Sequence, residues 1–196
     1  MIIRQIQIPV DIKWRLRQKA KVFIMNAGNG GLGGRNGTKE LIEAMRYVKS
    51  PITLLIRSQI PIKVPFDDER IKIEIGTISK ERLWSEGDVF IFPEKFNGLS
   101  LPLQEAFVSG MLVMAGDRFP MNEWLPKEPL IPVSHYTKER YAVTFDCAQY
   151  DPKVIASTID AWYDTDIEKY SLLGKEFGEK NSWNNLKGIY ETLLSQ

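Results

Sequence analysis

The sequence predicts an α/β domain with a doubly wound, mainly parallel sheet, helices on both faces and a helical C-terminal end. Three observations predict it. Short apolar runs typical of buried strands recur in the first two thirds of the chain, segments of helical periodicity separate most of them, and amphipathic helical segments fill the last third. Strands separated by helices cannot be joined by tight turns, so we expect them to pair in parallel.

The first 21 residues are expected to form a basic lead-in. Residues 2–21 carry six Lys or Arg residues and one acid, Asp11. We expect a solvated edge or linker here, and contact with a phosphate or a membrane surface is the alternative. Residues 22–196 are expected to form one Rossmann-like domain, because the length suits a single domain and no segment has the composition of a linker.

Local signals define the strands and helices up to residue 115. Val22–Met25 is a buried apolar run, and apolar residues then recur at helical spacing until Ser50-Pro51 ends the helix. Residues 71–75 alternate between isoleucine and a charged residue, which is typical of a half-buried strand near a sheet edge. The expected strands are 22–25, 52–56, 71–75, 88–92 and 111–115, and the expected helices begin near Thr38 and span 79–86 and 101–109.

Three successive helices are expected at the end of the chain. The segments 152–163 and 167–177 each place apolar side chains on one helical face. Ser182 can cap a third helix. The apolar stripe of this helix consists of Trp183, Leu186, Ile189, Tyr190 and Leu193.

Composition and charge limit the function classes. The chain has 26 Lys or Arg residues against 25 Asp or Glu, so its net charge of +1 provides no global field for nucleic acid, and an anionic ligand has to be held locally. A single cysteine, Cys147, excludes an internal disulfide and a cysteine-built metal site. No apolar run is long enough for a bilayer and residues 1–4 lack the order of a signal peptide, so a cytoplasmic location is expected.

A glycine-rich loop, residues 27–37, follows the first strand. Gly28 and Gly30 allow a ligand close to the backbone, and with Gly33 they satisfy the pattern G-x-G-x-x-G. In dinucleotide sites the helix begins inside this pattern and an acid follows the second strand, whereas here the helix begins near Thr38 and Arg57 follows. A nicotinamide site is therefore weakly supported. An NADP site, with Arg57 at the 2′-phosphate, and a turn without function remain open.

A second loop, residues 93–100, joins a buried strand to a helix with Pro102 in its first turn, and Ser100 can cap that helix. The backbone amides of Gly98, Leu99 and Ser100 can face a diphosphate at the positive end of the helix dipole. Glu105 follows one turn later and can accept hydrogen bonds from a ribose. The alternative for Glu105 is that it only complements the dipole.

These segments resemble a known family. Pro93–Gly110, followed by the apolar strand 111–115 and Glu123, resembles the donor-binding motif of family-4 glycosyltransferases of GT-B fold, "glycosyl transferases group 1". Arg35–Ala44 resembles the segment before the family's first helix, and 181–183 resembles the start of its C-terminal helix. The resemblance implies the C-terminal, nucleotide-sugar-binding half of such an enzyme, with retaining stereochemistry and without the acceptor-binding half.

The sequence departs from the family pattern at three charged positions, one of which is the strand end near residues 26–28, where the family usually has an arginine. Asn97 stands where the first of two acids is expected, and Asn36 stands where a lysine is usual. By the resemblance, Phe96 and Asn97 lie on the sugar side of the site. The cations that could compensate near the diphosphate are Arg35, Lys39 and Arg57, and no catalytic residue is assigned. His135, the single histidine, is expected to be a surface or structural residue.

The sequence therefore predicts a glycosyltransferase donor domain that binds a UDP- or GDP-sugar and needs no metal or other cofactor. The isolated domain is expected to be weakly active or inactive, because nothing in it orders an acceptor. A non-catalytic nucleotide-sugar-binding or assembly module and one half of a split glycosyltransferase are the alternatives. A separate acceptor-binding domain or a second copy of the chain is the corresponding partner, and no nucleic acid is expected.

Overall fold

A five-stranded parallel sheet forms the centre of the structure, a computed structural model that describes residues 11–29, 34–140 and 142–195. All neighbouring strands pair in parallel, in the order β3-β2-β1-β4-β5, and the chain moves outward from the central β1 first to one side and then to the other. This confirms the doubly wound sheet. The strands are β1 (Val22–Gly28), β2 (Thr53–Ser58), β3 (Ile71–Ile75), β4 (Val89–Phe92) and β5 (Leu112–Ala115).

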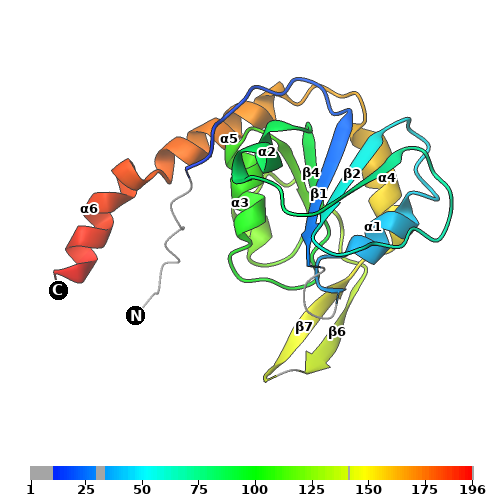
Figure 1. Cartoon of the computed structure of the whole chain (residues 1–196). Helices are drawn as coiled ribbons and strands as arrows, with labels where there is room; N and C mark the ends of the chain where they lie inside the picture. The colour runs from blue at the N-terminus through cyan, green and yellow to red at the C-terminus, as the bar shows by residue number, and fades with distance from the viewer. Residues whose placement is uncertain (1–10, 30–33, 141, 196) are drawn as a thin grey trace.

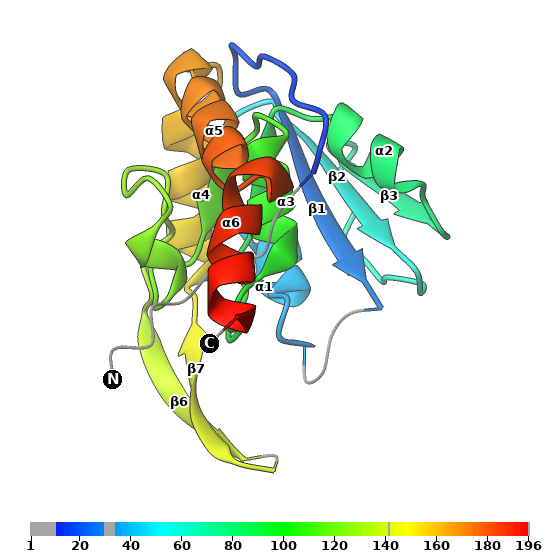
Figure 2. The ribbon, with the colours of Figure 1, turned by 90° about the vertical axis from the view of Figure 1, so that its left-hand side faces the viewer.

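Helices cover both faces of this sheet, as the sequence predicts (Figures 1 and 2). One face carries α1 and α4, and the opposite face carries α2, α3 and α5. The last helix, α6, extends away from the sheet beyond α5 (Figure 1). The helices are α1 (Thr38–Ala44), α2 (Lys80–Ser85), α3 (Leu101–Val108), α4 (Pro152–Trp162), α5 (Glu168–Lys180) and α6 (Trp183–Leu194).

The core lies where strands are covered on both faces. Every residue of β4 and β5 is buried, and their continuous apolar sequences are the kind that such strands require. β3, whose charged and apolar residues alternate, forms an edge of the sheet and buries none of its side chains fully, which confirms its predicted place. Among the described residues no helix is long and apolar enough to cross a membrane.

The hairpin formed by β6 (His135–Arg140) and β7 (Thr144–Gln149) was not predicted. It projects past the edge at which the parallel strands end (Figure 1). Nearly all side chains of β6 are exposed, so this strand lacks the apolar face from which a strand is predicted, whereas β7 buries Cys147 and Ala148. His135 lies on its exposed strand, in agreement with the expected surface position.

The described part of the basic lead-in packs on the domain. The Arg17 side chain is only 2% exposed and donates to backbone oxygens of Trp84 (2.7 Å), Gly87 (3.2 Å) and Ser109. Burial lowers the pKa of Arg17 to about 10. Trp14 Nε1 donates to the Ser171 carbonyl at 2.9 Å. The expectation of a solvated segment is therefore wrong for Arg17, because these carbonyl groups replace its water; residues 1–10 lie outside the described part.

The helical C-terminal end is confirmed, and α6 differs from the prediction in what it buries. Ser182 occupies the position before the first turn, and its side chain makes no capping hydrogen bond. Of the predicted stripe only Leu186 is buried, while Trp183 is 58% exposed and Ile189 is 49% exposed. An amphipathic helix thus presents apolar side chains to solvent.

Candidate functional site

The two loops singled out in the sequence meet at the edge where the parallel strands end. The backbone amide of Lys95, in the loop after β4, donates to the Arg35 carbonyl, in the glycine-rich loop after β1, at 2.7 Å. Gly37 has φ 71°, and a Cβ atom there would lie 2.1 Å from the Pro93 carbonyl oxygen. Only glycine allows this approach, so Gly37 fixes the spacing of the two loops.

A buried carboxylate organises the second loop. Glu94 is 1% exposed, and its Oε2 accepts hydrogen bonds from Ser100 Oγ at 2.9 Å and from Asn97 Nδ2 at 3.0 Å. Its Oε1 lies 3.3 Å from Nη2 of Arg118, which is itself buried. Both carboxylate oxygens therefore have partners. Burial raises the pKa of the Glu94 carboxyl, and the charge of Arg118 opposes that shift.

Arg118 and Tyr150 hold the backbone of the same loop. Arg118 Nε donates to the Glu94 carbonyl at 3.1 Å, and the Tyr150 hydroxyl donates to that carbonyl at 2.8 Å. A Cβ atom at Gly116, which follows β5, would lie 1.8 Å from the Tyr150 hydroxyl, so the ring needs a glycine there. Glu94, Arg118 and Tyr150 are not among the predicted site residues, although Glu94 and Arg118 follow strand ends, where ligands bind in parallel sheets.

Ser100 and Asn97 have different roles from those expected. Ser100 occupies the position before α3, but its hydroxyl donates to Glu94 and makes no capping bond, so the predicted side-chain cap is wrong. Asn97 Oδ1 accepts from the Ser100 amide at 3.3 Å, while its Nδ2 donates to Glu94. The Asn97 amide group thus closes the loop on itself.

The loop presents two backbone donors at the start of α3. The amides of Gly98 and Leu99 donate to no group within the described residues, and the space around Gly98 Cα is open. They lie at the positive end of the helix dipole, where an anion is stabilised. The Phe96 ring packs against Phe145 of β7, with ring centroids 4.5 Å apart, so the hairpin supports the outer side of this loop.

Glu105 lies on α3, and its side chain contacts α2. Its Oε2 accepts from Trp84 Nε1 at 3.1 Å, and its Oε1 lies 3.7 Å from Lys80 Nζ. The side chain is 24% exposed, so the carboxylate remains accessible. A carboxylate can accept about four hydrogen bonds, which leaves acceptor capacity on Glu105 for a further donor.

The cations expected near a diphosphate differ in their exposure and in their partners. Arg57 is 2% exposed, with ion pairs to Glu74 (3.2 Å) and Glu86. It also donates to two backbone carbonyls of α2, so every guanidinium nitrogen has a protein partner. These contacts tie β2 to β3 and α2, and the role of Arg57 as a phosphate ligand stays a prediction. Lys39 is exposed on α1.

Of the three cations expected near a diphosphate, Arg35 is the one whose charge acts on Glu94 in the second loop. Its charge lowers the pKa of Glu94, opposing the effect of burial, and its buried Nε has no hydrogen-bond partner in the described part of the chain. Gly28 ends β1 with φ 57°, and Gly30 lies outside the described residues. Near Gly28 a small cavity of about 160 Å³ opens, lined in part by Ile78 and Asn26. The amide atoms of the Asn26 side chain are buried and find no partner among the described residues.

No family model and no curated protein matches the sequence. Solved structures do match the fold. A GtfA/B complex aligns with a TM-score of 0.69 at 16% identity, over 97% of this chain and 38% of that one. A glycosyltransferase from Rickettsia africae aligns with a TM-score of 0.62 at 15% identity, over 89% of this chain and 48% of that one. HepE of Anabaena, solved with UDP and glucose, aligns with a TM-score of 0.59 at 14% identity, over 90% of this chain and 49% of that one.

This chain therefore spans less than half the length of each of these relatives. At such identities the likeness shows the fold. The chain shares its Rossmann-like α/β fold with part of several solved glycosyltransferases.

Proposed function

We propose that this chain binds a nucleoside-diphosphate sugar, with UDP or GDP as the nucleotide, as the donor domain of a retaining GT-B glycosyltransferase. The observation that carries the proposal is the pair of unpaired amides, Gly98 and Leu99, at the start of α3. Oriented backbone amides at a helix N-terminus suit a diphosphate. The fold likeness to glycosyltransferases, one of them solved with UDP and glucose, supports the same ligand class.

Each part of the ligand has a matching group. The diphosphate lies against the Gly98 and Leu99 amides, and Arg35 adds positive charge near the same loop. The ribose hydroxyls donate to Glu105, whose carboxylate Trp84 holds in place from α2. These contacts come from backbone and side chains of the protein, so the site requires no metal ion.

A second candidate is a binding or assembly module that functions with another polypeptide. The specific observation is the exposed apolar side of α6, where Trp183, Ile189 and Leu193 face solvent. One solved structure of the same fold is described as a complex. Analytical ultracentrifugation discriminates the two candidates, since a stable homo-oligomer without nucleotide affinity favours the assembly module.

Isothermal titration of the whole chain with UDP, GDP and UDP-glucose tests the proposal. We expect saturable binding of one nucleotide, weakened in Glu105→Gln by about 1 to 3 kcal/mol, because a charged acceptor of ribose hydroxyls becomes a neutral amide. Glu81→Gln, an exposed acid on α2, is the matched control and should not change affinity. If no nucleotide binds at millimolar concentration while circular dichroism shows a folded chain, the proposal is wrong.

A further inference from the structure

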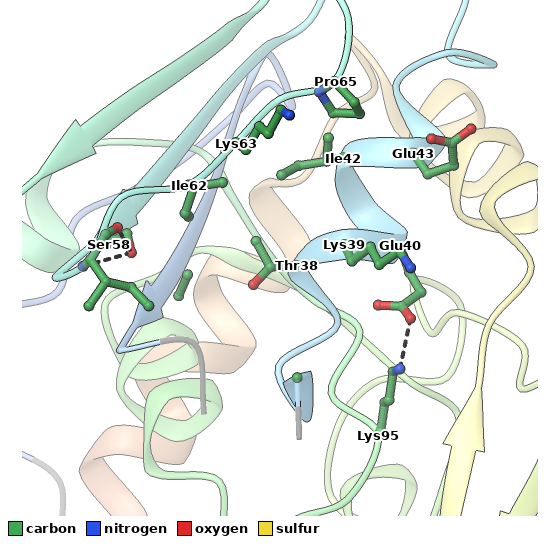
Figure 3. A pocket seen from close by; sticks show the side chains of 13 residues that line it. Thr38, Lys39, Glu40, Ile42, Glu43, Ser58, Ile62, Lys63, Pro65 and Lys95 are labelled. Carbon is green, nitrogen blue, oxygen red and sulfur yellow. Dashed lines mark hydrogen bonds and ion pairs between the residues drawn. The ribbon is translucent and has the colours of Figure 1, made fainter. Parts of the chain in front are cut away.

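A cavity lies on the face of the sheet that carries α1, opposite to α3 and Glu105. It has a volume of about 660 Å³ and opens between α1 and the segment that joins β2 to β3 (Figure 3). Thr38 and Glu40 line it from α1, while Ile62, Lys63 and Pro65 line it from the opposite segment. Pockets of this size hold small molecules. Of the loop that follows β4, Lys95 lines this cavity, whereas Gly98, Leu99 and Glu105 do not.

Two buried oxygen atoms of this pocket lack partners. Thr38 Oγ1 and Glu40 Oε2 are buried and form no hydrogen bond within the described residues. The other carboxylate oxygen of Glu40 pairs with Lys95 Nζ at 2.7 Å, as the dashed line in Figure 3 shows. A carboxylate oxygen only accepts hydrogen bonds, so the missing partner of Glu40 has to donate one. A ligand hydroxyl meets this requirement and can also bond to Thr38.

The charges of the pocket favour an anion. Its acids are already paired: Glu40 with Lys95, and Glu43 with Arg46 at 3.1 Å. Lys39 and Lys63 form no ion pair in the part of the chain that the structure describes, and both are exposed. Two unpaired ammonium groups therefore remain, and they attract a negative group and repel an amine.

The remaining wall is aliphatic. Ile42 is buried under the pocket, and Ile62 and Pro65 cover it from the other side. Such a wall packs against C–H groups and offers them no hydrogen bond. The ligand should thus combine hydroxyl groups, a carbon body and a negative charge.

We propose that this pocket binds a small hydroxylated phosphate, of the sugar-phosphate class, at a site separate from the nucleotide site. Its hydroxyls donate to Glu40 and bond to Thr38, its carbon body lies against the isoleucines, and its phosphate is held by Lys39 and Lys63. This site goes beyond the proposed donor function and does not depend on it.

Isothermal titration with glucose 1-phosphate, glycerol 3-phosphate, glucose and inorganic phosphate tests the site. One of the two organic phosphates should bind at least about tenfold more tightly than glucose or phosphate, because only it uses both the hydroxyl and the charge contacts. Equal binding of inorganic phosphate would reduce the site to simple anion attraction and overturn the proposal. Absence of binding by both organic phosphates would overturn it as well.

Variants and competition locate the binding. Thr38→Val and Lys63→Ala should each weaken the organic phosphate by about fivefold or more, while Lys72→Ala, an exposed lysine on β3, should leave it unchanged. Thermal melting controls for folding. Saturating UDP should not compete, and competition would mean that the phosphate occupies the nucleotide site. If the chain binds the sugar phosphate but does not bind UDP, the proposed donor function is contradicted and the second site is not.

Discussion

The Ser100 hydroxyl donates to the Glu94 carboxylate across 2.9 Å, at a serine whose backbone has φ 45°. A non-glycine residue in the left-handed region costs free energy unless its surroundings hold it there. Glu94 supplies the holding contact, and the same oxygen accepts from Asn97. The buried carboxylate therefore fixes the loop that presents the Gly98 and Leu99 amides.

Glu94→Gln should lower the free energy of unfolding by about 1 to 3 kcal/mol, because an NH2 group replaces one buried oxygen and cannot accept the hydrogen bonds from Ser100, Asn97 or Arg118. Urea unfolding followed by circular dichroism measures the change. Glu81→Gln, an exposed substitution of the same kind on α2, should stay within about 0.5 kcal/mol of the wild type. Equal effects of the two variants would contradict the role given to Glu94.

The stability difference between the wild type and Glu94→Gln should depend on pH. Burial raises the pKa of Glu94 above its ordinary value of 4.5, so just above that value the folded state binds more protons than the unfolded state. The wild type then gains stability as the pH falls from neutral toward 4.5, and the variant lacks this gain. The difference should widen over this range in urea titrations, and a constant difference would contradict the raised pKa.

Asp68 should show the opposite pH dependence. The hydrogen bonds from Arg70, at 2.7 and 2.9 Å, lower the pKa of Asp68, so its contribution is present above the unfolded pKa and lost as the pH falls below it. Asp68 orients Arg70, which donates to three carbonyls at the end of α1 and in the segment after it.

Asp68→Asn should therefore cost about 1 to 2 kcal/mol at pH 7, and the loss should shrink below pH about 4. Urea unfolding at several pH values measures it. Asp146→Asn removes an exposed ion pair with Lys138 and is the control, expected to cost less than about 0.5 kcal/mol. If the loss of stability in Asp68→Asn does not vary with pH, the lowered pKa of Asp68 is contradicted.

Gly37→Ala should destabilise the chain by about 2 kcal/mol or more, since it combines a left-handed backbone with a Cβ atom 2.1 Å from the Pro93 carbonyl oxygen. Gly188→Ala, at an open position in α6, should be neutral or slightly stabilising. Differential scanning calorimetry compares the two melting temperatures. Similar shifts in both variants would show that the two loops do not need this close approach.

The sheet could be predicted from sequence because its signals are local. The apolar residues of β4 and β5 and the alternation in β3 each appear within a few consecutive residues, and they place two strands in the covered core and one at an edge. The β6–β7 hairpin escaped prediction because β6 is almost entirely exposed and polar, so no apolar alternation marks it as a strand that pairs with β7.

The candidate site could be predicted only in part. The loop after β4 was recognised from its glycine, serine and proline. The buried Glu94 at the centre of this loop was not recognised, because its partners Arg118 and Tyr150 are distant in sequence and meet it only in the fold. The ion pairs of Arg57 with Glu74 and Glu86 could not be predicted for the same reason, because these residues meet only in the fold.

Titration of the ¹⁵N-labelled chain with UDP and GDP, followed by amide NMR shifts, tests the central claim most directly. If these amides hold the diphosphate, we expect the largest shifts at the Gly98 and Leu99 amides and smaller shifts around Glu105 and Arg35. Saturation without any shift at Gly98 and Leu99, or shifts confined to the pocket of Thr38 and Lys63, would contradict it.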